Sequence, residues 1–197
     1  GAAWEIIDEA GKSTRFMTPP SRGFRLLRDA VLSLSLTEAF VRPLYHWRTS
    51  RPHEYTGSAL NSAGDDNALF QSGPAHGAPP ANVRLGADDF LLDHLGGGFD
   101  LLVFGATVPA DVQAAVKAWQ AKGLKLRVLL IGQCASAPGV DACLPDTEGR
   151  ARARWGVRTD GAAYLLRPDQ HVCARWMTLD AHRLSAALQQ ATTGVAP

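Results

Sequence analysis

The residues of this chain best suited to covalent chemistry are its three cysteines, Cys134, Cys143 and Cys173. No two of them stand at the C-x-x-C spacing that thiol oxidoreductases use. An odd number of cysteines in 197 residues is also not the pattern of a secreted disulfide scaffold. We therefore expect small, buried, hydrophobic thiols in a protein of the reducing cytoplasm.

Cys173 lies in the stretch "AYLLRPDQHVCARW", residues 163–176, which has two short apolar runs around a polar turn. Pro168 and Asp169 suit the centre of a type I turn, so the stretch predicts a β-hairpin. We expect Cys173 to be a packing residue rather than a reactive one. The period-two alternation of a strand assigns one face of the second run to Val172, Ala174 and Trp176, and the other to Cys173 and Arg175.

Two glycine-containing stretches resemble parts of phosphate-binding loops. "GKST" at 11–14 lacks the glycine that a P-loop needs five positions earlier, where Ile6 stands, and a helical pattern precedes it. It is expected to be a polar break between two helices. "GGGF" at 96–99 comes before an apolar run instead of after one, so it cannot present a helix N-terminus to a pyrophosphate. We expect a helix-to-strand loop there.

The histidines and paired carboxylates do not form a recognisable site. No histidine pair has the i, i+4 spacing or the adjacent cysteines of a zinc site, and no G-x-S-x-G motif occurs. Double aspartates at 65 and 88 fit loop polarity and helix capping. The sequence therefore predicts no catalytic, cofactor-binding or metal-ligating residue. The histidines are His46, His53, His76, His94, His171 and His182, of which His171 is expected to be exposed.

Composition excludes several classes of partner. The net charge of +1 provides no electrostatic footprint for nucleic acid or an acidic membrane surface. No apolar run approaches the roughly 18 residues that a membrane helix needs. We expect neither a nucleic-acid nor a membrane partner.

Residues 1–48 predict a helical arm. Apolar residues recur at helical spacing over 2–16 and 22–36, and a short third helix containing Pro43 is expected after Thr37. The first helix has no N-cap residue, which favours a piece of a longer protein. The apolar faces predict exposed hydrophobic area over residues 4–44 that invites self-association.

Residues 49–82 are rich in Gly, Pro, Ser and Asn and predict a long irregular linker. Residues 83–197 predict an α/β domain with the element order β-α-β-α-β-β-α. Its first two strands should be parallel with a right-handed crossover, and its last two should form the antiparallel hairpin. This is the order of the thioredoxin fold, with a mixed sheet and helices on both faces.

A redox-active thioredoxin carries its thiols just after the first core strand, at a helix N-terminus that lowers the thiol pKa. In this chain that junction reads "FGATVPADVQ", residues 104–113, and holds no cysteine. The proline that thioredoxins place before the third strand is also missing from "RTDGAAYLL". Disulfide oxidoreductase activity is therefore disfavoured.

Three stretches resemble the C-terminal portion of FAD-dependent aromatic hydroxylases, in the group of phenol hydroxylase and 3-(3-hydroxyphenyl)propionate hydroxylase. They are "SRGFRLLRDAVLSLS", "FLLDHLGGGFDLLVFG" and "GAAYLLRPDQHVCARW", in the family's order. The resemblance spans nearly the whole chain and implies a thioredoxin-like domain without redox cysteines. The family's G-x-G-x-x-G turn and its later Gly-Asp motif do not occur, so no flavin-contacting residue is transferred to this chain.

Two functions remain open. The resemblance implies a non-redox accessory domain, for assembly, stability or dimerisation, of a monooxygenase that uses FAD, NAD(P)H and dioxygen on an aromatic ring. Its partner would be an N-terminal FAD and substrate domain of the same protein, with a homodimer contact as a further option. This chain alone is expected to be inactive and to hold no cofactor. The alternative is a stand-alone thioredoxin-like oxidoreductase, acting through Cys134 or Cys173, or a binding module.

Overall fold

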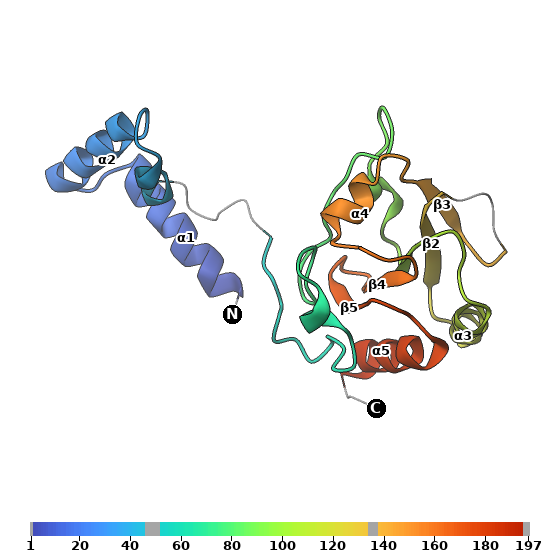
Figure 1. The fold of residues 1–197 in the computed structure, drawn as a ribbon. Helices are drawn as coiled ribbons and strands as arrows, with labels where there is room; N and C mark the ends of the chain where they lie inside the picture. The colour runs from blue at the N-terminus through green and yellow to red at the C-terminus, as the bar shows by residue number, and fades with distance from the viewer. Residues whose placement is uncertain (1, 46–51, 134–137, 195–197) are drawn as a thin grey trace. The chain divides into compact units, whose positions relative to one another are not determined.

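The computed structural model describes residues 2–45, 52–133 and 138–194. The chain divides into two compact units, Gly1–His53 and Glu54–Pro197 (Figure 1). The first unit contains two α-helices and a 3-10 helix, and the second contains the sheet. Each unit is described separately below.

The helical unit forms where the apolar period predicts it. Ser21 caps the second helix, because its hydroxyl accepts a hydrogen bond from the amide of Phe24 at 3.4 Å. Pro43 lies inside the third element, where the backbone adopts the tighter 3-10 form. The elements are α1 (Ala2–Met17), α2 (Arg22–Leu34) and η1 (Ala39–Leu44).

The "GKST" stretch is not a break between helices, as the sequence had predicted. Residues 11–14 lie inside α1, which continues to Met17. A glycine inside a helix costs only about 1 kcal/mol relative to alanine. The next residue, Lys12, offsets part of that cost because it pairs with Asp8 at 2.7 Å and with Glu9 at 3.1 Å. The chain turns instead at residues 18–21, where two prolines stand.

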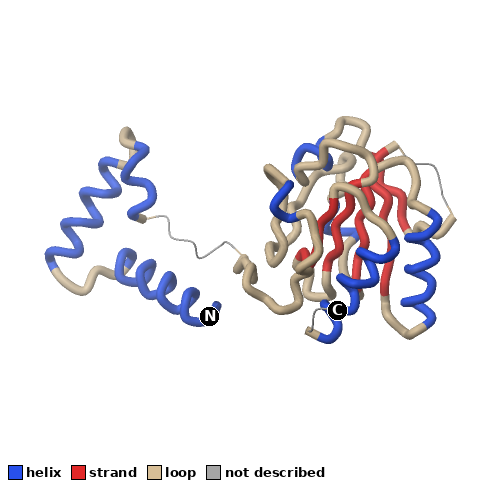
Figure 2. The backbone as a smooth tube through the Cα atoms, turned by 60° about the horizontal axis from the view of Figure 1, so that its bottom comes forward, coloured by secondary structure: helices blue, strands red, loops and turns tan. Residues whose placement is uncertain are grey.

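The second unit is built on a five-stranded mixed sheet in the order β3-β2-β1-β4-β5. The first three strands are parallel, and β4 and β5 are antiparallel to their neighbours. Figure 2 shows the strands, in red, lying side by side. This arrangement confirms a thioredoxin-like α/β domain, although the short edge strand β3 was not predicted. The strands are β1 (Phe99–Phe104), β2 (Leu126–Gly132), β3 (Ala142–Pro145), β4 (Ala162–Leu166) and β5 (Val172–Trp176).

The two faces of the sheet are covered differently. One face packs against α3 (Ala110–Ala121) and α5 (Ala181–Thr193), through buried aliphatic residues on both helices. The other face packs against α4 (Arg150–Arg154) and the 3-10 turn η3 (Leu91–His94), around the fully buried Trp155. Burial on both faces explains why β1 and β4 are apolar throughout except for a single aspartate.

The predicted hairpin forms, but the side chains of its second strand are divided between the two faces of the sheet differently from the prediction. Leu165 pairs with Ala174 while Leu166 pairs with Val172, so Cys173 is an extra, unpaired residue. Such a β-bulge reverses the alternation on one side of the insertion. Cys173 therefore lies with Ala174 and Trp176 in the core under α3 and α5, whereas Val172 lies in the opposite core.

The turn of the hairpin has the expected centre. The amide of Gln170 donates to the carbonyl of Arg167 at 2.8 Å, which encloses Pro168 and Asp169. Gln170 itself has a φ of 59°, in the left-handed region. A type I turn followed by a left-handed residue is the usual three-residue hairpin loop.

The irregular segment 54–82 belongs to the sheet unit, which begins at Glu54 rather than at the predicted residue 83. Its backbone amides hydrogen-bond to the carbonyls of β5. Ser62 donates to Cys173 at 2.7 Å, Asp66 to Arg175 at 2.9 Å, and Gly77 to Val172 at 2.6 Å. Because β5 is an edge strand, these bonds satisfy carbonyls that would otherwise be open to another chain.

The guanidinium of Arg175 holds this segment from inside. Its Nε donates to Oδ1 of Asn67 at 2.7 Å, and its Nη1 and Nη2 donate to the carbonyls of Ser72 and Asn67, both at 3.1 Å. The same group stacks on the ring of Phe70, with its carbon 4.6 Å from the ring centre. Only 5% of Arg175 is exposed. A buried cation here is matched by hydrogen-bond acceptors and a π face.

Arg175→Met should lower the free energy of unfolding of the sheet unit by about 3 kcal/mol, because buried acceptors lose their donors. Arg154→Met, at an exposed position in α4, is the matched control and should change it by less than about 0.5 kcal/mol. Urea unfolding followed by tryptophan fluorescence measures both. Equal midpoints for the two variants would show that the Arg175 contacts contribute nothing to stability.

Candidate functional site

The thiol of Cys173 is not available for redox chemistry. The residue is fully buried, and burial raises the pKa of its thiol to about 12. The charge of nearby Arg167 opposes this shift but does not overcome it. Since the thiolate is the nucleophile in disulfide exchange, Cys173 is an inert packing residue at neutral pH.

Cys143 is not the buried free thiol that the sequence predicted. It lies in the edge strand β3 and is disulfide-bonded. Cys134 lies outside the described residues. The position that matters for thioredoxin chemistry is the junction between β1 and α3, residues 105–109, which contains no cysteine. The redox site of that fold is therefore not built from the described residues.

The described histidines do not cluster, and several of them contact a single carboxylate. His94 lies 2.6 Å from Asp89, and His53 lies 2.8 Å from Glu5. His171 is partly buried, not exposed as predicted, because its ring packs edge-on against Tyr55. In the part of the chain that the structure describes, no three His, Cys, Asp or Glu residues are grouped so that they could hold a metal ion.

The loop of three glycines, Gly96 to Gly98, does not fit a dinucleotide cradle. It leads into β1 instead of connecting a strand to a helix. The amide of Gly96 already donates to the buried carboxylate of Asp100 at 2.7 Å, and Arg127 approaches the same carboxylate at 2.6 Å. Burial raises the pKa of Asp100, against the lowering effect of these two donors. Gly96 thus donates to an internal ion pair between Asp100 and Arg127.

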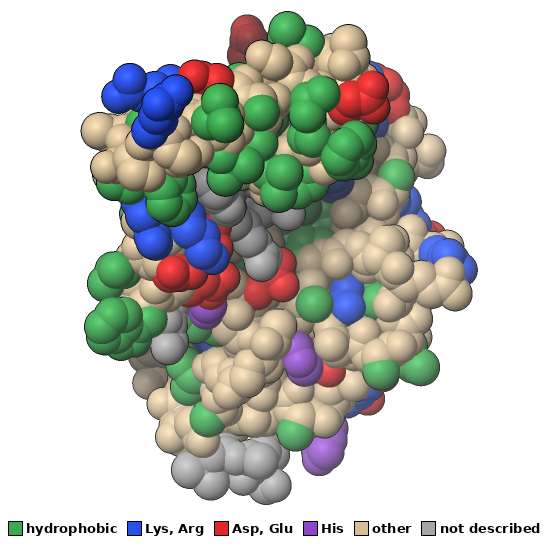
Figure 3. Space-filling model, turned by 90° about the vertical axis from the view of Figure 1, so that its left-hand side faces the viewer, with side chains coloured by type: hydrophobic (Ala, Val, Ile, Leu, Met, Phe, Trp, Pro, Cys, Tyr) green, Lys and Arg blue, Asp and Glu red, His purple; other side chains and the backbone are tan. Residues whose placement is uncertain are grey.

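The surface most suited to function lies on the helical unit. Large hydrophobic side chains are exposed along α1, α2 and the segment that follows, which confirms the predicted exposed apolar area over residues 4–44. Figure 3 shows hydrophobic side chains, in green, gathered on one face of this unit. No described helix is long and apolar enough to cross a membrane. The exposed side chains are Trp4, Ile6, Ile7, Met17, Phe24, Leu26, Leu27, Leu32, Leu34, Leu36, Phe40 and Leu44.

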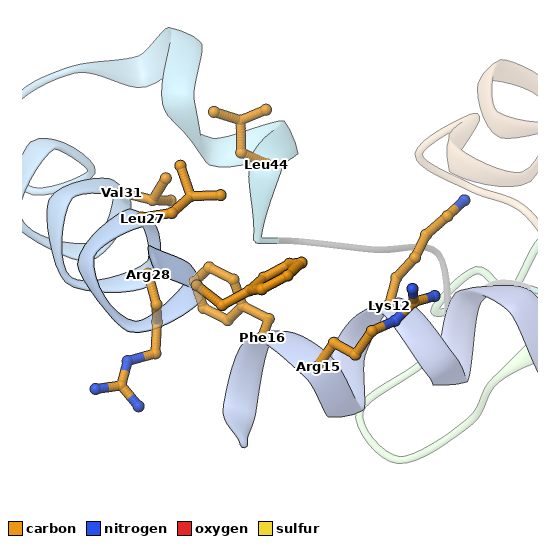
Figure 4. Close-up of a pocket in the computed structure, with 8 residues that line it drawn as sticks. Lys12, Arg15, Phe16, Leu27, Arg28, Val31 and Leu44 are labelled. Atoms are coloured by element: carbon orange, nitrogen blue, oxygen red, sulfur yellow. The ribbon is translucent and has the colours of Figure 1, made fainter. Parts of the chain in front are cut away.

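A hollow of about 390 Å³ lies within this unit, between α1, α2 and η1. Figure 4 shows Phe16, Leu27, Val31 and Leu44 turned toward one another, with Lys12 and Arg15 on one side and Arg28 on the other. Of the floor residues, Val31 is buried, whereas Leu27 and Leu44 are about half exposed. We call this feature the helical hollow. Phe24 completes its lining.

The sequence indicated only part of this surface. The helical period over residues 22–36 predicted an apolar face, on which Phe24, Leu27 and Val31 lie. The cationic rim of the helical hollow was not predicted, because its members come from two helices whose packing the sequence does not give. The available signal was weak: Arg15 precedes Phe16, and Arg28 follows Leu27.

Comparison with known proteins gives a likeness of fold. No protein-family model matches the chain, and no curated protein matches it in sequence. A solved structure of the rebeccamycin biosynthetic enzyme RebC with reduced flavin matches 98% of this chain with a TM-score of 0.62 and 20% identity. That match spans 34% of the RebC chain.

Two further solved structures resemble the chain. One is a ternary complex of aklavinone-11 hydroxylase with FAD and aklavinone, with a TM-score of 0.52 and 23% identity over 96% of this chain and 38% of that one. The other is the flavin-dependent monooxygenase PieE with FAD and substrate, with a TM-score of 0.51 and 23% identity over 87% of this chain and 31% of that one.

These matches show that the chain has the fold of a part of flavin-containing enzymes, and they confirm the resemblance seen in the sequence at the level of fold. The chain spans about a third of the length of the proteins it matches. The matched region includes the helical unit as well as the thioredoxin-like domain, since nearly the whole chain is covered.

The raised pKa of Cys173 predicts a specific loss of stability at alkaline pH. Above pH 9.0 the thiol ionises in the unfolded chain but stays protonated in the folded one, up to about pH 12. The free energy of unfolding should therefore fall as pH rises through this window, by at most about 1.4 kcal/mol per pH unit. Cys173→Ala removes the part of this pH dependence that comes from the thiol. Urea midpoints measured at about pH 8 and about pH 10.5 should fall less in the variant; parallel falls would contradict the assignment.

Proposed function

We propose that this chain is the non-redox, thioredoxin-like accessory part of an FAD- and NAD(P)H-dependent aromatic-ring monooxygenase. In that protein it serves assembly, stability or dimer contacts, and the chemistry takes place elsewhere. The observation that carries the proposal is the fold match over nearly the whole chain to about a third of flavin-containing enzymes. The stretches that resemble the aromatic hydroxylase family point the same way.

The state of the thiols supports a non-redox role. Cys173 is buried with a raised pKa, and the β1–α3 junction lacks a cysteine. In a parent hydroxylase, Cys173 would thus be one of the small residues that let β5 pack under α3 and α5. Replacing it with alanine would remove one sulfur atom from that core and leave the chemistry of the flavin part untouched.

The helical unit supports a role in assembly. Two α-helices and a 3-10 helix bury few of their own large apolar side chains, and contiguous apolar surface rarely stays exposed in a folded protein. We propose that the flavin-binding part of the same polypeptide covers it. FAD and NAD(P)H belong to that part in this proposal, because none of the described strand-to-helix loops carries the repeated glycines of the G-x-G-x-x-G turn that places a pyrophosphate at a helix N-terminus.

The rival function is a thiol oxidoreductase or a free-standing binding module. Insulin reduction separates the first of these from our proposal. The chain should reduce insulin no faster than a variant in which Cys134, Cys143 and Cys173 are all replaced by alanine, because the free cysteine among the described residues, Cys173, is buried. Faster thiol-dependent reduction by the unchanged chain would support the oxidoreductase.

The cofactor assignment makes its own prediction. FAD added to the isolated chain should remain unbound, so that its fluorescence and its elution on a desalting column equal those of free FAD. A stoichiometric flavin spectrum that survives desalting would contradict the assignment of FAD to the other part of the protein. Riboflavin, which lacks the pyrophosphate, is the control ligand for nonspecific binding to the apolar surface.

A further inference from the structure

The helical hollow combines an apolar floor with a rim of one charge. Its floor is made by Phe16, Phe24, Leu27, Val31 and Leu44. Every charged residue in its lining is a cation, and no carboxylate contributes to it. The hollow of about 390 Å³ is within the range of sites that take a ligand or several side chains.

The three cationic side chains at the rim differ in how many of their donors already have a partner within the unit. Lys12 is paired with carboxylates of its own helix, and Arg28 contacts the neighbouring Asp29 at 2.7 Å. Arg15 donates only to the carbonyl of Gly11, at 3.2 Å, and contacts no carboxylate among the described residues. Arg15 thus retains donors for an anion from outside the unit.

Resting on the proposed function, we propose that the helical hollow receives an apolar segment flanked by carboxylates, from the flavin-binding part of the same polypeptide. The apolar floor takes the hydrophobic side chains of that segment, and Arg15 and Arg28 pair with its carboxylates. Two observations select this occupant: the single sign of charge on the rim, and the threefold greater length of proteins that contain this fold.

The alternatives fit the same surface less well. Two copies of this chain meeting hollow to hollow would bring the same cations together, because a twofold contact places a patch opposite itself. An anionic lipid surface would match the charge. It would favour a protruding apolar face over a concave one, however, since a flat bilayer cannot fill a hollow.

The test uses the full-length protein. Arg15→Glu with Arg28→Glu should lower the temperature at which half of the bound flavin is released by about 5 °C or more, because the carboxylates of the segment would then face like charge. The control variant, Arg22→Glu with Arg25→Glu, changes the net charge by the same amount at two positions of α2 that lie outside the lining. It should shift the flavin-release temperature by about 1 °C or less. Raising the salt concentration should reduce the difference in flavin-release temperature between these two variants.

Arg15→Lys with Arg28→Lys preserves the charge and should retain most of the flavin stability, which separates loss of pairing from failure to fold. If the full-length protein holds flavin but the hollow and control variants behave alike, this inference is wrong and the proposed function stands. A full-length protein without flavin overturns the proposed function itself.

Two measurements on the 197-residue chain test the other occupants. In sedimentation velocity, any self-association of the chain should be unchanged by Arg15→Glu with Arg28→Glu. In flotation with vesicles of phosphatidylglycerol and phosphatidylcholine, any binding should likewise be unchanged when these two arginines are replaced. A positive result in either would assign the hollow to a second copy or to lipid, and would overturn the proposal.

Discussion

Burial of the Arg175 guanidinium is the constraint on which the sheet unit depends. The edge strand β5 presents one side to the core and the other to a segment that has almost no regular structure. Arg175 extends from β5 into this segment and donates hydrogen bonds to Asn67 and Ser72. The segment has almost no helix or strand of its own that could supply these donors. Arg167 repeats the device at the turn, where it contacts Asn61 at 3.3 Å and Asp169 at 2.8 Å. Two buried arginines thus turn a glycine- and proline-rich stretch into the cover of an edge strand.

This arrangement also explains why Cys173 is inert. The β-bulge that accommodates the extra residue turns its side chain into the core under α3 and α5, and the carbonyl of Cys173 accepts a hydrogen bond from Ser62. The same geometry that anchors segment 54–82 therefore removes the thiol from solvent. The sheet is covered by α3 and α5 on one face and by α4 and η3 on the other, and segment 54–82 is hydrogen-bonded along its β5 edge. The β1–α3 junction, where redox-active thioredoxins carry their thiols, has no cysteine.

Where one physical signal dominated, the sequence predicted the structure well. The long apolar runs gave β1 and β2, helical period gave α2, α3 and α5, and Pro168 with Asp169 gave the turn. It failed where tertiary contacts decide: the four residues of β3 carry no strand pattern of their own, and the bulge at Cys173 depends on pairing with β4. The boundary at residue 83 was misplaced because glycine and proline content signals irregular backbone, which can be tightly bonded when buried donors are supplied by another strand.

In the proposed function, this chain is one part of a flavin-containing protein. An antibody against residues 54–197 should detect, in extracts of cells that make the protein, a polypeptide about three times as long as this chain, as the 34% coverage of RebC implies. That band should coincide with flavin fluorescence through successive columns. A band of this chain's own length, with no flavin in the same fractions, would contradict the account.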